Sequence, residues 1–249
     1  MASKLFKTRG IVLRAVKYGE TSLVITIYTE LFGIQSYLVN GVRKAAGKSG
    51  GKANLFQPAA ILDLVVYHQE GRSLNRIKEF HWAQLYQTIF SEVTKNAVAL
   101  LMVELLSHCL KQPEENSALY QFTEDCLLNL DEASPGITAN MSIFFALHLT
   151  HFFGVSPRLA EIEGETIYFD LIDSVISTSL PSHLQFIEGK QANACAEILR
   201  ARQPIELDEI KLNQESRRQV LQALEQYYLL HVQDFRVLKT LPVLGAVLS

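Results

Sequence analysis

The segment from residue 41 to residue 52 carries four cationic side chains and no acidic one. The cations are Arg43, Lys44, Lys48 and Lys52, and the four glycines among them disfavour a stable helix or strand. A flexible, positively charged loop of this composition suits contact with phosphate groups. We therefore interpret the segment as a polyanion-contacting loop, with an ordinary solvated loop as the alternative.

The same loop partly matches the phosphate-binding loop of ATP-binding proteins. Gly47, Lys48 and Ser49 fit the end of that motif, but five residues separate Gly47 from the preceding Gly41, where the motif has four. The motif also needs a helix that starts at the Lys-Ser pair, and two further glycines follow at once. ATP binding is therefore disfavoured.

Two histidines offer the strongest pattern for a metal site or for catalysis. His148 and His151 lie one helical turn apart, and His108 with Cys109 falls on another predicted helix. Phe and Leu residues surround the pair, which is typical of a packed core helix, and no carboxylate completes a ligand set. The motifs of serine hydrolases, zinc proteases and dinucleotide-binding enzymes are absent. The sequence predicts no catalytic residue, no metal and no cofactor, and a protein that is not an enzyme.

Charge and periodicity divide the chain into two parts. Residues 1–80 contain twelve Lys/Arg and five Asp/Glu, a net charge of +7, whereas residues 81–249 carry a net charge of −10. The first part suits a nucleic-acid partner, and the second suits scaffolding or protein contacts. Short β-branched runs separated by turns predict strands at 10–16, 23–29, 34–39, 60–67 and 73–80. Five short strands predict a small OB-type barrel, with an SH3-like module as the alternative.

Helical periodicity begins after residue 81 and continues through most of the chain. Helices are predicted at 97–110, 116–130, 138–153 and 192–201 and from residue 213 onward, with an irregular or hairpin excursion near 162–178. The predicted fold class is α+β: residues 1–80 form a five-stranded OB-type β-barrel and residues 81–249 a mostly α-helical C-terminal domain. The longest apolar run has seven residues, and the N-terminus lacks the apolar core of a signal peptide. We therefore expect a cytoplasmic protein with no membrane partner.

Several short motifs follow one another in a characteristic order near each end of the chain. The N-terminal motifs are Gly10-Ile-Val-Leu-Arg14, Tyr18-Gly-Glu-Thr-Ser-Leu-Val24, Gly33-Ile, Asn40-Gly-Val-Arg-Lys44 and Leu55-Phe-Gln-Pro58. The C-terminal motifs are Tyr228-Leu-Leu-His231 and Phe235-Arg-Val-Leu-Lys-Thr-Leu-Pro-Val-Leu244. In this order and spacing they resemble the RecO recombination mediators of bacteria. The resemblance covers roughly the first 80 and the last 30 residues, and the middle is similar only in being helical.

The resemblance implies an OB barrel on a helical C-terminal domain, in agreement with the periodicity. It also implies a non-enzymatic DNA repair and recombination mediator that binds single- and double-stranded DNA without sequence specificity and anneals complementary strands. Its partners would be RecR, with which it loads RecA on SSB-coated DNA, and the C-terminal tail of SSB. Its location would be the bacterial cytoplasm, in association with the nucleoid.

One feature departs from the family. Many members carry a four-cysteine zinc site after a segment like Phe153-Gly-Val-Ser-Pro157, but residues 158–178 of this chain contain no cysteine. No zinc is therefore predicted. Packing around Tyr168, Phe169, Leu171 and Ile172 would hold this excursion instead.

Cations of the barrel are expected to neutralise phosphates without reading base edges. The predicted DNA-binding residues are Arg9, Arg14, Lys17, Arg43, Lys44, Lys48 and Lys52, together with Tyr37, which we expect to face outward and stack a base. Arg43 and Lys44 are the strongest candidates, and Arg217 and Arg218 are expected secondary contacts. The alternative is a protein-interaction adaptor, in which the basic barrel binds an acidic protein segment and DNA plays no part.

Overall fold

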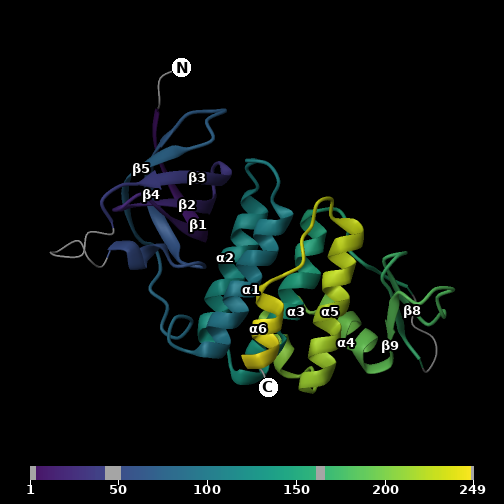
Figure 1. Ribbon diagram of the computed structural model, residues 1–249. Coiled ribbons are helices and arrows are strands. Elements are labelled where there is room, and N and C mark those ends of the chain that lie inside the picture. The colour runs from purple at the N-terminus through teal and green to yellow at the C-terminus, as the bar shows by residue number, and fades with distance from the viewer. Residues whose placement is uncertain (1–3, 43–51, 161–165, 248–249) are drawn as a thin grey trace. The chain divides into compact units, whose positions relative to one another are not determined.

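The computed structural model describes residues 4–42, 52–160 and 166–247 (Figure 1). The chain forms two compact units, of which the first contains Met1–Tyr86 and Leu110–Leu127 and the second Gln87–Cys109 and Leu128–Ser249. The first unit is built on strands and the second on helices. The domain boundary expected after residue 80 stays a prediction.

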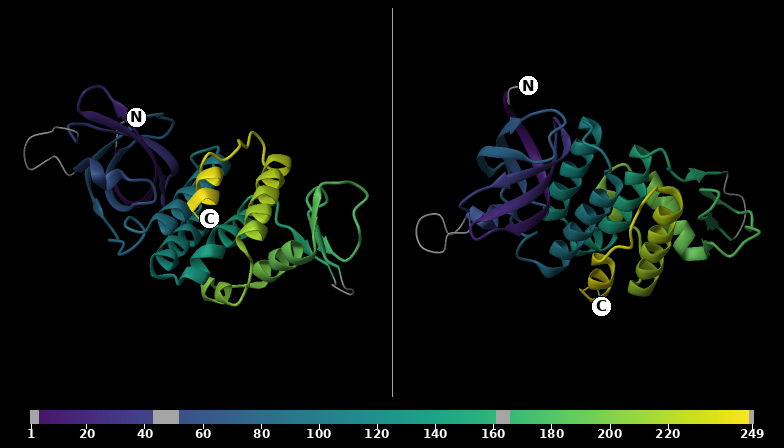
Figure 2. Two further views of the ribbon diagram at one scale, coloured as in Figure 1. Left: turned by 60° about the horizontal axis from the view of Figure 1, so that its bottom comes forward. Right: turned by 45° about the horizontal axis from the view of Figure 1, so that its top comes forward.

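Five strands form the framework of the first unit. They are β1 (Lys4–Tyr18), β2 (Ser22–Thr29), β3 (Gly33–Val39), β4 (Ile61–His68) and β5 (Asn75–Trp82). The strands close into a barrel in the order β1-β2-β3-β5-β4. Figure 2 shows the barrel from two further sides. Because β1 is long, its first half pairs with β4 and its second half with β2. The predicted five-stranded OB-type barrel is confirmed.

Branched apolar side chains fill the barrel. Alternate residues of β2 and β4 point inward, and Val12, Ile25, Ile27, Leu62 and Val66 are all 0% exposed. Burial of such side chains stabilises the fold by about 1.5–3 kcal/mol each before the entropy cost of ordering them. The barrel therefore has a packed interior, and its ligand-binding features must lie on its outside or at its ends.

The start of helix α2 (Ser117–Glu132) and the residues before it pack on the barrel within the first unit. The Tyr28 hydroxyl donates a hydrogen bond to the Asn116 carbonyl at 3.0 Å, and the Tyr28 and Tyr120 rings lie 5.8 Å apart. Gly33 has a φ of 60°, and a Cβ atom there would lie 2.1 Å from the Glu114 carbonyl oxygen. Glycine is thus required where this segment crosses the barrel.

Helices make up most of the second unit. They are α1 (Val93–Cys109), the end of α2, α3 (Pro135–Phe152), α4 (Gly189–Arg200), α5 (Gln214–His231) and α6 (Thr240–Val247). The α3 helix starts at Pro135, whose ring pre-sets φ, and the Ser134 side chain caps it by accepting from the Ile137 N–H. The predicted helices are observed, but the helical region predicted from residue 213 onward is divided into α5 and α6, and a short 3-10 helix η2 (Pro204–Asp208) was not predicted.

A four-stranded sheet includes the segment near residues 162–178, for which the sequence predicts either a hairpin or an irregular excursion. Its strands are β6 (Arg158–Leu159), β7 (Tyr168–Asp170), β8 (Val175–Ser177) and β9 (Phe186–Glu188), in the order β6-β8-β7-β9. Phe169 is fully buried and its ring lies 5.5 Å from the Tyr227 ring, whereas Ile172 is 43% exposed. The Leu171 carbonyl lies 2.7 Å from His231 Nε2. Apolar packing and this polar contact therefore hold the sheet on α5.

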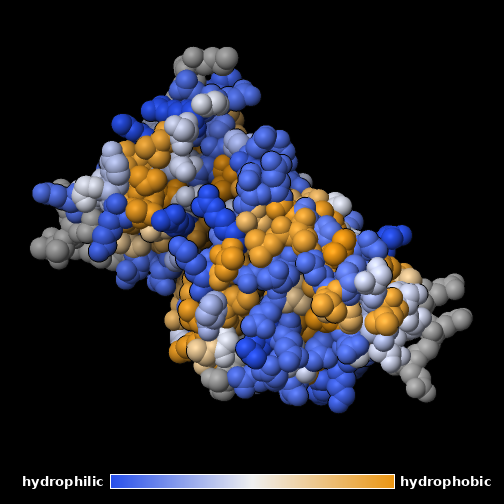
Figure 3. Space-filling model, turned by 45° about the vertical axis from the view of Figure 1, so that its right-hand side comes forward, coloured by the Kyte–Doolittle hydropathy of each residue, from blue (hydrophilic) through white to orange (hydrophobic). Residues whose placement is uncertain are grey.

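Apolar side chains also reach the surface, where orange areas interrupt the blue ones in Figure 3. Exposed examples in the second unit are Leu180, Leu184, Ile205, Val237 and Val243. Single exposed side chains of this kind are normal for folded proteins. Among the described residues no helix is long and apolar enough to cross a membrane.

Candidate nucleic-acid interface

The ends of β1 and β2 form an exposed hairpin. Residues Arg14–Tyr18 of β1 are all exposed and pair with Ser22–Thr26 of β2. The turn between them contains Gly19, which has a positive φ of 58°. The hairpin thus presents Arg14, Lys17 and Tyr18 to solvent, with Glu20 at its turn as the opposing charge.

A β-bulge explains why Arg9 and Arg14 both point outward. Residues five apart in a regular strand would face opposite sides. The register between β1 and β2 shifts between Val12 and Arg14, and Leu13 is buried like Val12 before it. The extra residue reverses the alternation, as bulges do. Arg9, Arg14 and Lys17 are all exposed, as expected, and Lys17, three residues after Arg14, lies on the opposite face of the hairpin.

The basic loop follows β3, which lies beside the hairpin in the sheet. Leu23 of β2 pairs with Lys17 on one side and with Val39, the last residue of β3, on the other. The Ser22 hydroxyl also donates a hydrogen bond to Asn40 Oδ1 at 3.0 Å. The chain therefore enters residues 43–51 from the end of the barrel that carries the hairpin.

Three of the predicted loop cations, Arg43, Lys44 and Lys48, lie outside the described residues, so their roles stay predictions. Lys52 is exposed at the start of the short 3-10 helix η1 (Lys52–Phe56). Phe56 is buried against Phe80, with ring centroids 4.6 Å apart, and anchors this helix on the barrel.

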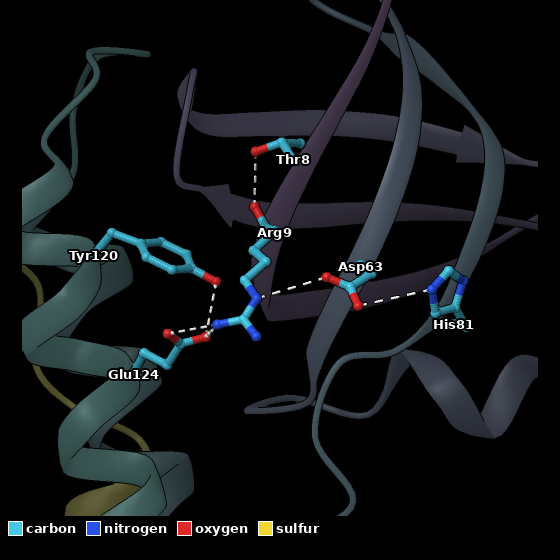
Figure 4. A network of polar contacts seen from close by, with 6 residues as sticks. All are labelled: Thr8, Arg9, Asp63, His81, Tyr120 and Glu124. Carbon is cyan, nitrogen blue, oxygen red and sulfur yellow. Dashed lines mark hydrogen bonds and ion pairs between the residues drawn. The ribbon is translucent and has the colours of Figure 1, made fainter.

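Arg9 is engaged in a polar network within the first unit (Figure 4). Its Nη1 donates to both Glu124 oxygens at 3.1 Å, and its Nε lies 3.6 Å from Asp63 Oδ1. The Arg9 side chain is 48% exposed and that of Glu124 only 6%. Burial raises the pKa of Glu124, and the Arg9 guanidinium opposes this effect. Arg9 therefore compensates a buried carboxylate, and a phosphate would have to compete for it.

Tyr37 faces the barrel interior, so the expectation that it points outward and stacks a base is wrong. Its side chain is 0% exposed on β3, and burial raises the pKa of its hydroxyl. The exposed aromatic of the hairpin is Tyr18, at 58% exposure, beside Lys17. Sequence reasoning missed Tyr18, although its place directly before the Gly19 turn signals a strand end in solvent.

The two arginines proposed as secondary contacts lie in the first turns of α5. Arg217 donates to the Leu212 carbonyl, and burial lowers the pKa of its guanidinium. Arg218 Nη2 lies 2.7 Å from Glu215 Oε1. Both charges have partners within their own segment, and DNA contact by Arg217 and Arg218 stays a prediction.

The histidines considered for a metal site take part in packing. His148 Nε2 lies 3.0 Å from the Ile198 carbonyl oxygen, and its ring is 4.3 Å from that of Phe144. Within the described ranges, no three His, Cys, Asp or Glu side chains form a metal-binding group.

Comparison with known proteins connects this geometry to a family. Residues 1–86 match the family described as "Recombination protein O N terminal", and residues 91–162 match "Recombination protein O C terminal". A DNA repair protein RecO of Bacteroides fragilis is 32% identical over 241 residues, which cover 96% of this chain and 98% of that protein. The chain belongs to the RecO family. Membership supports a role in DNA repair and recombination.

Other RecO proteins align over similar lengths. The DNA repair protein RecO of Christiangramia forsetii is 31% identical and covers 98% of this chain and 99% of its own length. The DNA repair protein RecO of Phocaeicola vulgatus is 29% identical, and the alignment covers 98% of this chain and 100% of that protein. The RecO N-terminal match includes the whole barrel and its hairpin, and the C-terminal match ends after β6, before the other strands of the second sheet and before Arg217.

Proposed function

We propose that the protein is a non-enzymatic recombination mediator of bacterial DNA repair. It binds single- and double-stranded DNA without sequence specificity and anneals complementary strands. The observation that carries the proposal is the exposed hairpin with Arg14, Lys17 and Tyr18, which lies within the region of the RecO N-terminal match. Four further cations occur in the sequence at residues 41–52, after β3, and β3 pairs with the β2 strand of the hairpin.

Sequence-independent binding follows from the chemistry of these side chains. Lysine and arginine contacts with phosphates release counterions, and they carry no information about the bases. Annealing two strands requires the repulsion between their backbones to be reduced while the base edges stay free to pair. A cationic hairpin that contacts only phosphates meets both requirements.

The cellular role that we propose follows from family membership. The protein acts in the cytoplasm at the nucleoid, together with RecR, and loads RecA on DNA coated by SSB. It contacts SSB through the C-terminal tail of SSB. Co-purification of RecR, and binding of a peptide with the SSB tail sequence, test these two partners directly.

DNA binding is tested by a salt series with a fluorescent single-stranded oligonucleotide of arbitrary sequence. The variant R14E/K17E reverses the charge of the two exposed cations of the hairpin. Its affinity should fall at every salt concentration. Each lost phosphate contact should flatten the log–log salt dependence by about 0.7 for a single strand, so we expect a total decrease of about 1.4.

A matched control reverses two exposed cations of the second unit, Lys190 and Arg202, and so changes the net charge equally. K190E/R202E should bind with nearly the wild-type slope. Equal slopes for the wild type and R14E/K17E would remove the hairpin from the interface. Binding of an acidic peptide in place of any oligonucleotide would instead favour the adaptor function.

A further inference from the structure

A cavity of about 660 Å³ lies at one end of the barrel, and none of its described lining residues belongs to the β1–β2 hairpin. It is bounded by the start of β1, the β2–β3 turn and the β4–β5 turn, to which Lys4, Leu31 and Gly71 belong respectively. Its volume falls within the range of about 300–1,000 Å³ that is usual for small-ligand sites. All of its lining residues belong to the first unit.

Three partly exposed aromatic rings line this cavity. The rings of Phe32 and His68 are stacked, with centroids 3.9 Å apart and an interplanar angle of 11°. Phe6 meets Phe32 edge-on at 5.2 Å. Burial lowers the pKa of His68, although the nearby Glu70 carboxylate opposes this shift, so the surroundings favour the uncharged ring. Each of the two stacked rings covers one face of the other, and both side chains are partly exposed, so a flat ligand would stack on an outer face of the pair.

Charge around the cavity is balanced. Lys4 and Arg72 are opposed by Glu70 and Glu115 among the lining residues. A balanced site does not attract a polyanion strongly, so its ligand must be recognised mainly through ring contacts. Flat aromatic ligands that stack on side chains include the nucleobases, whose faces are all suitable whatever their sequence.

We propose that this cavity binds one unstacked base of single-stranded DNA against the Phe32–His68 ring pair, an inference that rests on the proposed DNA-binding function. A base inside a duplex is already stacked and paired, and it can enter only after it is extruded at a cost. The cavity therefore favours single strands and frayed ends over duplex. Because it acts through stacking, its contribution is largely independent of salt, unlike that of the cationic hairpin.

The test uses the full-length protein and a thymidine oligonucleotide that contains a single 2-aminopurine. Stacking on aromatic rings changes the fluorescence of this base, and binding to the wild type should quench it. The variant F32L keeps an apolar side chain but removes the ring. It should lose roughly tenfold in single-strand affinity, in line with loss of one stacked base, with an unchanged salt slope and unchanged duplex affinity.

Two further variants decide what a loss of affinity means. F32W retains a ring and should bind like the wild type, which separates stacking from a folding defect. F186L removes a partly exposed ring from the second unit and should have no effect. Unchanged quenching and affinity in F32L, or an equal loss in F32W, would overturn the base-binding site. If the wild type bound no oligonucleotide at all, the proposed function itself would fail, whereas salt-dependent binding without an F32L effect would overturn the cavity alone.

Discussion

The Arg9–Glu124 pair joins two side chains with very different access to water. Glu124 lies almost wholly inside the protein, whereas about half of the Arg9 side chain is in solvent. If its partner is removed, Arg9 can be hydrated, but Glu124 cannot. The net effect of the surroundings raises the pKa of Glu124, so its ionised form is disfavoured despite the arginine. A folded-state pKa above the unfolded value stabilises the fold at low pH, and that contribution is lost as the pH rises.

This difference predicts unequal effects of removing the two partners. At pH 7, R9Q should lower the free energy of unfolding by about 1–2 kcal/mol, because it leaves a buried carboxylate without a counter-charge. E124Q should change it by less than about 0.5 kcal/mol, because Arg9 remains solvated. Urea unfolding of both single variants and of R9Q/E124Q measures this, and the double variant should recover most of the R9Q loss. Equal losses in R9Q and E124Q would contradict the argument.

The position of Tyr37 shows why one residue of the site could not be predicted. On β3, Gln35, Tyr37 and Val39 are buried, while Ile34 and Leu38 are partly exposed. Apolar residues occur on both faces of this strand, so alternation alone does not say which face is inside. The inward position of Gln35 depends on hydrogen bonds, from Asn75 Nδ2 at 3.3 Å and to the Phe32 carbonyl at 2.9 Å. These partners are distant or backbone groups, which periodicity does not reveal.

At the scale of elements, Asp131 at the end of α2 forms hydrogen bonds with residues 87–89, the segment before α1 in the second unit. Its carboxylate accepts hydrogen bonds from the backbone N–H groups of Gln87, Thr88 and Ile89 at 2.7, 2.8 and 2.9 Å. Lys95 is also buried and donates to the Asp131 carbonyl at 2.8 Å. Burial alone would raise the pKa of Asp131, but the three N–H groups outweigh it and the pKa falls below its ordinary 3.8. The carboxylate thus stabilises the fold in its ionised form.

We expect D131N to lower the free energy of unfolding by about 2 kcal/mol at pH 7, because an NH2 group replaces one carboxylate oxygen and leaves at least one of the three backbone N–H donors without its acceptor. A depressed folded-state pKa contributes stability above pH 3.8, and this contribution is lost as the pH falls through the still lower folded-state value. The difference between the wild type and D131N should therefore shrink at pH 3. Urea midpoints at both pH values check this, with D173N, an exposed aspartate of the same unit, as the control. If the stability difference between the wild type and D131N were the same at pH 3 as at pH 7, the negative charge of Asp131 would not be its cause.

Most elements follow from local pattern, and those that do not depend on tertiary context. Alternation or helical periodicity predicts the five barrel strands and α1 to α5 within a few residues of their observed ends, except that β1 starts at Lys4 and the predicted strand at residue 10. The β6 and β9 strands have two and three residues and form only through pairing in the second sheet. The α6 helix begins where Glu104 of α1 accepts hydrogen bonds from the Lys239 and Thr240 backbones, at 3.0 and 2.8 Å. Such partners lie more than a hundred residues away in sequence.

At the scale of the whole molecule, residues 1–80 carry a net positive charge, whereas residues 81–249 carry a net negative charge. An acidic surface repels DNA, so the phosphate contacts should be restricted to the basic part. A short, salt-sensitive contact can hold a strand without preventing its release into a duplex. Stacking of one base in the barrel-end cavity would add affinity for single strands. This base would leave the cavity when it pairs with a complementary strand.

Annealing should therefore depend on salt in the same way as binding. We expect the wild type to accelerate annealing of complementary oligonucleotides of unrelated sequences to similar extents, and to lose this acceleration over the salt range in which binding is lost. R14E/K17E should lose acceleration at a lower salt concentration, in proportion to its weaker binding. Stopped-flow measurement with a fluorophore and quencher on the two strands gives these rates, and K190E/R202E serves as the charge-matched control. Acceleration by R14E/K17E at a salt concentration where it no longer binds would mean that annealing does not proceed through phosphate neutralisation by the hairpin, because a protein that has dissociated cannot reduce the repulsion between strands.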